Sequence, residues 1–133
     1  MLIFRKYKDN DRRGLEQLLA DEGMADFNFD GLIYLAIEDG ALVGLAKGDK
    51  FKNRWFLEYL LIAKDKRGRG LGDALLRSIL NRMNNLGARW VYSTRSEDYL
   101  LYKGFTLNEF GELELDVDEF FDKPCDGSGS CHV

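Results

Sequence analysis

The 133-residue sequence has one proline, and none of its apolar runs approaches the length of a bilayer. A membrane-spanning helix needs about 20 consecutive apolar residues, so we expect no membrane association. Apolar residues make up 45% and charged residues 32% of the chain. A chain this rich in apolar residues and this poor in proline is typical of a packed globular protein, not of a disordered or collagen-like one.

The sequence also lacks an excess of positive charge. It has 23 acidic and 19 basic residues, a formal net charge of −4 and a pI of about 5.0. No global positive field attracts polyanions, so nucleic acid is not an expected partner. The N-terminal stretch MLIFRKYKDNDRRG lacks the long apolar core of a signal peptide, and we therefore expect a cytoplasmic protein.

Cysteine and histidine are scarce and confined to the end of the chain. Cys125, Cys131 and the only histidine, His132, lie within the last nine residues, where they cannot crosslink a core. The Cys-x5-Cys-His spacing matches no common metal site and lacks a fourth ligand, so we expect no metal, although a zinc or copper site or a disulfide stays open. We interpret residues 1–121 as one mixed α/β domain and 122–133 as a Cys/Gly/Ser tail.

Hydrophobic periodicity and turn residues predict the order of the elements. Expected strands cover residues 2–7, 32–38, 41–48, 54–63 and 88–94, and a final hairpin turns at Gly111. Expected helices cover residues 9–23, capped by Asp9 or Asp11, residues 73–86, and 96–104 with Ser96 as a possible cap. Asp39-Gly40 predicts a tight hairpin, and Gly23 and Gly87 predict helix ends. The nearly continuous apolar content of 54–63 predicts a central strand that is buried on both faces.

A glycine-rich segment, KDKRGRGLGD (64–73), separates that strand from the second long helix. Glycines let an anion approach the free N–H groups at the start of a helix, and Lys64, Lys66, Arg67 and Arg69 supply positive charge nearby. A nucleotide-binding P-loop would need a Lys-Ser/Thr pair, which is missing. A dinucleotide fingerprint would need a glycine where Asp73 stands. The segment is therefore a candidate anion site of another kind, and a glycine-rich turn with solvated cations is the alternative.

Read from Arg67, RGRGLG fits the pattern Arg/Gln-x-x-Gly-x-Gly/Ala, and the chain resembles the GNAT superfamily of N-acetyltransferases. The resemblance covers the element order from Leu2 to about Val117, including the Asp39-Gly40 hairpin, LLIAKDK before the loop and YKGF before the last hairpin. It implies a mixed, mostly antiparallel sheet that is splayed between the fourth and fifth strands and flanked by helices. It also implies acetyl transfer from acetyl-CoA to a primary amine by direct attack in a ternary complex, without a metal.

The resemblance also implies which residues hold acetyl-CoA. The backbone amides that would cradle the pyrophosphate belong to Arg67, Gly68, Arg69, Gly70, Leu71, Gly72 and Asp73. Pantetheine would pair with the exposed strand edge at Leu60, Leu61 and Ile62. Ser93 stands where the family often has an asparagine. Because Asp73 adds negative charge near a phosphate, we expect its side chain to point away.

Acetyl transfer to an amine also needs a base and an acid. A free alkylamine has a pKa of about 10 and must lose a proton before it attacks, so a base is needed. Glu58 is the only acid between Lys50 and Asp65 and is our candidate for base or substrate contact. The family commonly has this glutamate two residues earlier, at Phe56, on the same strand face. The alternative is that Glu58 pairs with a basic group on a solvated face.

The leaving thiolate needs a proton, which the family usually takes from a tyrosine four residues before the glycine of GF. Leu100 occupies that position, so Tyr99 and Tyr102 are the candidates. Both could instead be packing residues. Without an acid, the chain would be a non-catalytic acyl-CoA-binding sensor or a protein-interaction module.

Basic and acidic residues cluster in different parts of the sequence. Lys47, Lys50, Lys52 and Arg54, with the loop cations, suggest a basic zone that meets the adenosine phosphates. Acids gather in two regions that form acceptor walls in this fold, at Asp21, Glu22, Asp26 and Asp30 and at Glu109, Glu112, Glu114, Asp116, Asp118 and Glu119. A cationic acceptor, such as a polyamine or basic peptide, is one hypothesis, and a solvated charged face is the other. The sequence allows a monomer or a homodimer.

Overall fold

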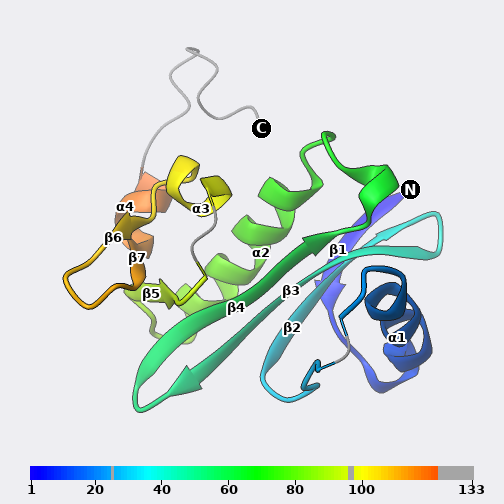
Figure 1. Ribbon diagram of the computed structural model, residues 1–133, viewed down its shortest axis with the longest axis horizontal. Coiled ribbons are helices and arrows are strands. Elements are labelled where there is room, and N and C mark those ends of the chain that lie inside the picture. Colours follow the sequence, from blue (N-terminus) through cyan, green and yellow to red (C-terminus); the bar gives the residue numbers. More distant parts are fainter. Residues whose placement is uncertain (25, 96–97, 123–133) are drawn as a thin grey trace.

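The computed structural model describes residues 1–24, 26–95 and 98–122, and it forms one seven-stranded sheet in the order β1-β2-β3-β4-β5-β7-β6 (Figure 1). The strands are β1 (Leu2–Lys6), β2 (Leu32–Glu38), β3 (Ala41–Phe51), β4 (Arg54–Ile62), β5 (Trp90–Ser93), β6 (Thr106–Leu107) and β7 (Leu113–Asp116). The helices are α1 (Arg12–Asp21), α2 (Leu71–Asn85), α3 (Asp98–Tyr102) and α4 (Val117–Asp122), with 3-10 turns at Asp9–Asp11 and Lys64–Lys66.

The sheet is antiparallel except between β4 and β5. Those two strands run parallel and pair only at Trp55 with Val91 and at Phe56 with Tyr92. Beyond Phe56 they diverge, so β5 lies beside only one end of the long strand β4 (Figure 1). The predicted fold class, including the splay between the fourth and fifth strands, is confirmed.

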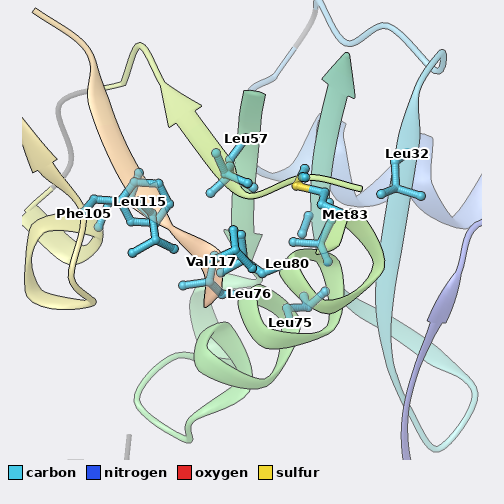
Figure 2. Close-up of a cluster of buried hydrophobic side chains, with 14 of the residues drawn as sticks. Leu32, Leu57, Leu75, Leu76, Leu80, Met83, Phe105, Leu115 and Val117 are labelled. Atoms are coloured by element: carbon cyan, nitrogen blue, oxygen red, sulfur yellow. The ribbon is translucent and has the colours of Figure 1, made fainter. Parts of the chain in front are cut away.

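Helices α1 and α2 cover opposite faces of the sheet. The buried face of α2 carries Leu75, Leu76, Ile79, Leu80 and Met83, which pack against sheet residues that include Leu57 (Figure 2). Three leucines of α1 pack on the other face, beside buried residues of β2 and β3. Each helix therefore buries the apolar stripe that its sequence predicted.

The turn residues behave as predicted at two places. Asp39 and Gly40 have φ angles of 51° and 84°, the pair of positive values that a type I′ hairpin requires. Gly23, with φ of 72°, follows the end of α1. Asp11 immediately precedes α1, but its carboxylate accepts hydrogen bonds from Arg5 at 2.7 and 2.8 Å instead of capping the helix. This ion pair with Arg5 lowers the pKa of Asp11.

The prediction that β4 is buried on both faces is wrong. Only Leu57 is buried, and the other eight residues of the strand are partly exposed. The apolar content is explained by the splay, because the edge of β4 beyond Phe56 has no strand beside it. Its apolar side chains therefore line a gap in the sheet.

A bulge in β4 was not predicted. Tyr59 pairs with Lys47, but Leu57 pairs with Gly48, so Glu58 is an extra residue in β4. As a result Leu57 packs on the α2 face and Tyr59 on the α1 face, although they stand two residues apart. Without the bulge both would share one face.

The last part of the described chain holds a helix that was missed. Helix α4 begins at Val117, which is fully buried, and the Asp116 side chain accepts the N–H of Glu119 at 3.3 Å. The Asp-x-x-Glu spacing is a capping signal that could have revealed it. Ser96, Cys125, Cys131 and His132 lie outside the described residues. Within the described ranges, no helix is long and apolar enough to cross a membrane.

Candidate active site

A cavity of about 500 Å³ opens beside the unpaired end of β4. It is lined by Leu60, Leu61, Ile62, Lys66, Arg67, Gly68, Gly70, Leu71, Gly72, Asp73 and Tyr99. The structure thus brings together the predicted strand edge, most of the predicted loop and one of the two candidate tyrosines. We call this space the loop cavity.

Glycine shapes the wall of the loop cavity. Gly68 and Gly70 have φ angles of 81° and 79°, in the left-handed region that favours glycine. A Cβ atom on Gly72 would lie 3.5 Å from the Tyr99 hydroxyl and 3.8 Å from Ile62. The absence of a side chain at Gly72 therefore keeps open the space between β4, α2 and α3.

The start of α2 offers free hydrogen-bond donors. The amide of Ala74 bonds to the Gly70 carbonyl at 3.2 Å, so the amides of the three residues before Ala74 precede the intrahelical ladder. The helix dipole adds partial positive charge at the same place. This is an arrangement that suits an anion, and it is built from backbone rather than from side chains.

The side chains of the loop cations are held by acids from other elements. Arg67 donates to the Ile62 carbonyl at 2.9 Å and to Glu22 at 2.9 Å. Arg69 forms an ion pair with Glu38, and Lys66 Nζ lies 3.3 Å from the same carboxylate. These two cations lower the pKa of Glu38 to about 2. The loop is therefore tied to the ends of α1 and β2.

Asp73 carries a negative charge at the start of α2, and two cations neutralise it. Lys103 Nζ lies 2.6 Å from one carboxylate oxygen, and Arg77 Nε lies 3.2 Å from the other. The side chains of Asp73 and Lys103 are only 11% and 7% exposed. This buried ion pair joins the start of α2 to the turn that follows α3.

The two candidate tyrosines have different environments. Tyr99 lines the loop cavity, and burial raises its pKa to about 12, with the nearby charge of Asp73 as a second cause. Tyr102 is 73% exposed and does not line the loop cavity. Leu100, at the family's tyrosine position, is buried in the core. The structure therefore places Tyr99 in the cavity and leaves Tyr102 at the surface.

Ser93 ends β5 and is 1% exposed. Its hydroxyl accepts the N–H of Arg95 at 3.2 Å, and Ser93 is not part of the wall of the loop cavity. The structure thus shows it as a buried residue of the strand end.

A second cavity, of about 390 Å³, lies beside the β4 bulge. It is lined by Asp49, Phe51, Phe56, Leu57, Glu58 and Thr94, and we call it the bulge cavity. Phe56, Leu57 and Glu58 all border this cavity. The loop cavity borders residues 60–62 of β4 and the bulge cavity residues 56–58, so both lie along the same strand.

Glu58 has a charged partner that sequence reasoning assigned to a different role. Its Oε1 lies 3.2 Å from Nζ of Lys47, whose side chain is 1% exposed, whereas that of Glu58 is 37% exposed. Lys47 was expected in a basic zone with the loop cations. No sequence signal marks it as buried, because its neighbours Tyr59 and Phe27 are set by strand pairing and by packing between distant parts of the chain.

The expected basic zone is wrong for a second reason. Arg54 lies at the start of β4 and forms an ion pair with Glu112 at 2.6 Å, whereas the glycine loop follows the other end of the strand. Nine strand residues span about 30 Å, so the two groups of cations are far apart. The predicted acceptor walls are also partly neutralised, because Glu22, Glu112 and Asp116 are held by arginines.

With the site described, comparisons with known proteins identify the family. Residues 3–103, well over half of the chain, match the model of the acetyltransferase (GNAT) family. The chain belongs to the GNAT acetyltransferase family. No curated protein matches it significantly.

Solved GNAT structures share the fold at low sequence identity. A GNAT family acetyltransferase from Brucella melitensis in complex with acetyl-CoA is 20% identical, with a TM-score of 0.70 over 87% of this chain and 88% of that one. Diaminobutyrate acetyltransferase EctA from Paenibacillus lautus is 20% identical, with a TM-score of 0.63 over 76% and 69%. The ribosomal-protein-S18-alanine N-acetyltransferase from Escherichia coli is 14% identical, with a TM-score of 0.69 over 88% and 94%.

Metal ligands do not gather anywhere in the parts of the chain that the structure describes. No group of three or more His, Cys, Asp or Glu residues there could hold a metal ion.

Proposed function

We propose that this GNAT protein transfers the acetyl group of acetyl-CoA to a primary amine by direct attack in a ternary complex. The observation that carries the proposal is the unpaired edge of β4, which has the loop cavity at one end and the bulge cavity with Glu58 farther along. One cavity suits the cofactor and the other the acceptor. The thioester bond that breaks would lie between the two cavities.

The loop cavity suits both the pyrophosphate and the extended pantetheine arm of acetyl-CoA. The amides of residues 67–73 would bind the pyrophosphate, since Gly68 and Gly70 present backbone without side chains and α2 begins there. The free edge at Leu60, Leu61 and Ile62 would pair with the amide groups of pantetheine, as an added strand does. Acetyl-CoA itself supplies the activated thioester.

Glu58 is the proposed base. Glu58 lines the bulge cavity, and only a neutral amine has the lone pair needed to attack a carbonyl carbon. Glu58 would accept the proton from the ammonium form, directly or through one water. Its partial exposure leaves it reachable by an acceptor.

Tyr99 is the proposed proton donor to the departing sulfur. A phenol whose pKa is about 12 is protonated at neutral pH and is still largely protonated at about pH 10, near the pKa of an alkylamine. Tyr102 is not retained in this role because it is largely exposed and lies outside the cavity wall. The sensor hypothesis was based on the missing tyrosine at position 100. Tyr99 removes that argument.

We propose the bulge cavity as the acceptor site. Asp49 and Glu58 can attract an ammonium group, and Phe51 and Phe56 offer apolar surface to a carbon chain. An amine acceptor is consistent with the diaminobutyrate and alanine acceptors named for two similar structures. The more specific proposal is that the acceptor carries positive charge.

The test is release of CoA thiol from acetyl-CoA in the presence of a panel of primary amines, small molecules and peptides. Wild-type protein should release CoA with at least one amine, and Glu58→Gln should lower kcat by about 10²- to 10⁴-fold, the usual contribution of a general base. Glu16→Gln, an exposed acid on α1 that lines neither of these two cavities, is the control and should leave kcat unchanged. Binding of acetyl-CoA without turnover of any amine would favour the sensor.

A further inference from the structure

Lys47 is a buried charged residue in the middle of the sheet. Its side chain is 1% exposed, and its Nζ lies 3.2 Å from Glu58 Oε1 and 6.0 Å from the centre of the Phe27 ring. Phe27 in turn packs on Tyr59, with ring centres 5.3 Å apart. The ammonium group thus lies near the ring of Phe27 and has one carboxylate partner among the described residues.

The pairing of β3 with β4 puts the two charged residues side by side. Lys47 lies opposite Tyr59 in the ladder, and Glu58 is the extra residue of the bulge, immediately before Tyr59. A buried ammonium is strongly disfavoured unless it is paired, so Lys47 holds Glu58 in one orientation.

The orientation matters because a carboxylate has two oxygens. Lys47 takes Oε1, and among the described residues no hydrogen bond or ion pair reaches Oε2. Glu58 also lines the bulge cavity, where the acceptor is proposed to bind. One oxygen is therefore fixed from the buried side while the other remains for a proton.

We propose that Lys47 is a positioning residue, which holds Glu58 so that Oε2 meets the acceptor amine. This inference rests on the proposed function, with Glu58 as base. Lys47 itself touches neither acceptor nor cofactor, since it lines neither cavity. Its effect should pass entirely through Glu58.

A double-mutant cycle in kcat tests this directly, with an amine that the wild-type protein acetylates. Lys47→Met should lower kcat about 10-fold, a fraction of the usual effect of losing a base, and should leave the KM for acetyl-CoA unchanged. In the Glu58→Gln background the same substitution should change kcat less than about 2-fold, because its partner is already gone. Lys50→Met is the matched control, since Lys50 lies on the same strand with Nζ 5.9 Å from the Trp55 ring centre.

Removing a buried charge can impair folding, so thermal melting accompanies each variant. Lys47→Arg keeps the positive charge and should retain more kcat than Lys47→Met, even if the methionine variant yields little folded protein. Equal losses of kcat from Lys47→Met in the wild-type and Glu58→Gln backgrounds would overturn the inference. So would a folded arginine variant no more active than the methionine variant. A wild-type protein that acetylates no amine would overturn the proposed function as well.

Discussion

Tyr99 is the residue whose environment most clearly changes its chemistry. Burial raises its pKa to about 12, so its hydroxyl keeps its proton throughout the range in which enzymes are assayed. Its position beside Gly72 and Ile62 places that hydroxyl at the end of the loop cavity near the start of α2. If Tyr99 donates a proton, its replacement should lower kcat. If Tyr99 only contacts the cofactor, its replacement should raise the KM for acetyl-CoA.

We predict that Tyr99→Phe lowers kcat about 10- to 100-fold with little change in the KM for acetyl-CoA, because proton donation contributes only in the transition state. Tyr102→Phe is the control and should leave kcat within about 2-fold, since Tyr102 is 73% exposed. Steady-state kinetics with varied acetyl-CoA checks both. A rise in the KM at constant kcat would show that Tyr99 only holds the cofactor.

At the scale of single residues, the sequence identified most of the candidate site but not its partners. The glycines and the strand edge could be predicted from the resemblance to the family, and Tyr99 because it stands one residue before the family's tyrosine position. Lys47 could not, since an isolated lysine on a strand is usually solvated and its contact with Glu58 depends on how β3 pairs with β4. Long-range pairings such as Arg67 with Glu22 have no local signal.

Among the elements, β3 and β4 pack so closely that a glycine is needed between them. A Cβ atom on Gly44 would lie 2.7 Å from Ile62 Cδ1, 2.9 Å from the Leu61 carbonyl oxygen and 3.2 Å from Leu75. Ile62 and Leu61 also line the loop cavity. The close approach therefore helps to set the shape of the proposed cofactor site.

Gly44→Ala should lower the free energy of unfolding by about 1–3 kcal/mol, the usual cost of overpacking a core. Gly14→Ala is the opposite case: the residue lies in α1, and its added Cβ would meet nothing closer than Leu42 at 3.9 Å. It should raise the free energy of unfolding by about 0.5–1 kcal/mol, because alanine favours the helix. Urea unfolding measures both. A neutral Gly44→Ala would mean that β3 and β4 can separate without cost.

The glycine loop is tied to the end of β2 by charge, which gives a pH signature. Arg69 and Lys66 lower the pKa of Glu38 from 4.5 to about 2. Because the folded-state pKa is the lower one, the stabilisation is complete above about pH 4.5 and is lost as pH falls through about 2.

Glu38→Gln should therefore melt below the wild type at about pH 6, and the difference should shrink steadily as pH is lowered toward about 2. Glu16→Gln is again the control, with no comparable dependence expected. Thermal melts across this pH range provide the measurement. A difference that stays constant down to about pH 2 would show that the ion pairs do not contribute in solution.

The order of elements follows from patterns that act locally. Alternation, helical spacing and the Asp39-Gly40 turn each specify structure within a few residues, and the structure confirms the strands and helices they predicted. The burial of β4 and its bulge depend on which strand lies beside it and on how far the pairing extends, and neither is a local property. Helix α4 is different, since its Asp116-x-x-Glu119 signal was present in the sequence.

At the scale of the whole molecule, the long strand β4 contributes residues to both the loop cavity and the bulge cavity. The sheet has an unpaired edge because β5 turns away after two pairs, and the glycine loop meets that edge where β4 ends. The cofactor proposal, the base and the role of Lys47 all require acetyl-CoA to lie in this gap. Its binding is therefore the central claim.

The most direct measurement is a thermal shift with acetyl-CoA, CoA and ATP on wild-type protein and on Gly72→Glu, which places a charged side chain between Tyr99 and Ile62. A ligand at about 100 times its Kd stabilises the folded state by about 2.7 kcal/mol, which raises the melting temperature by several degrees. We predict this shift for both CoA species with the wild type, little with ATP, and none with Gly72→Glu relative to its own unliganded melt. No shift for the wild type, or an equal shift for the variant, would contradict the proposed site.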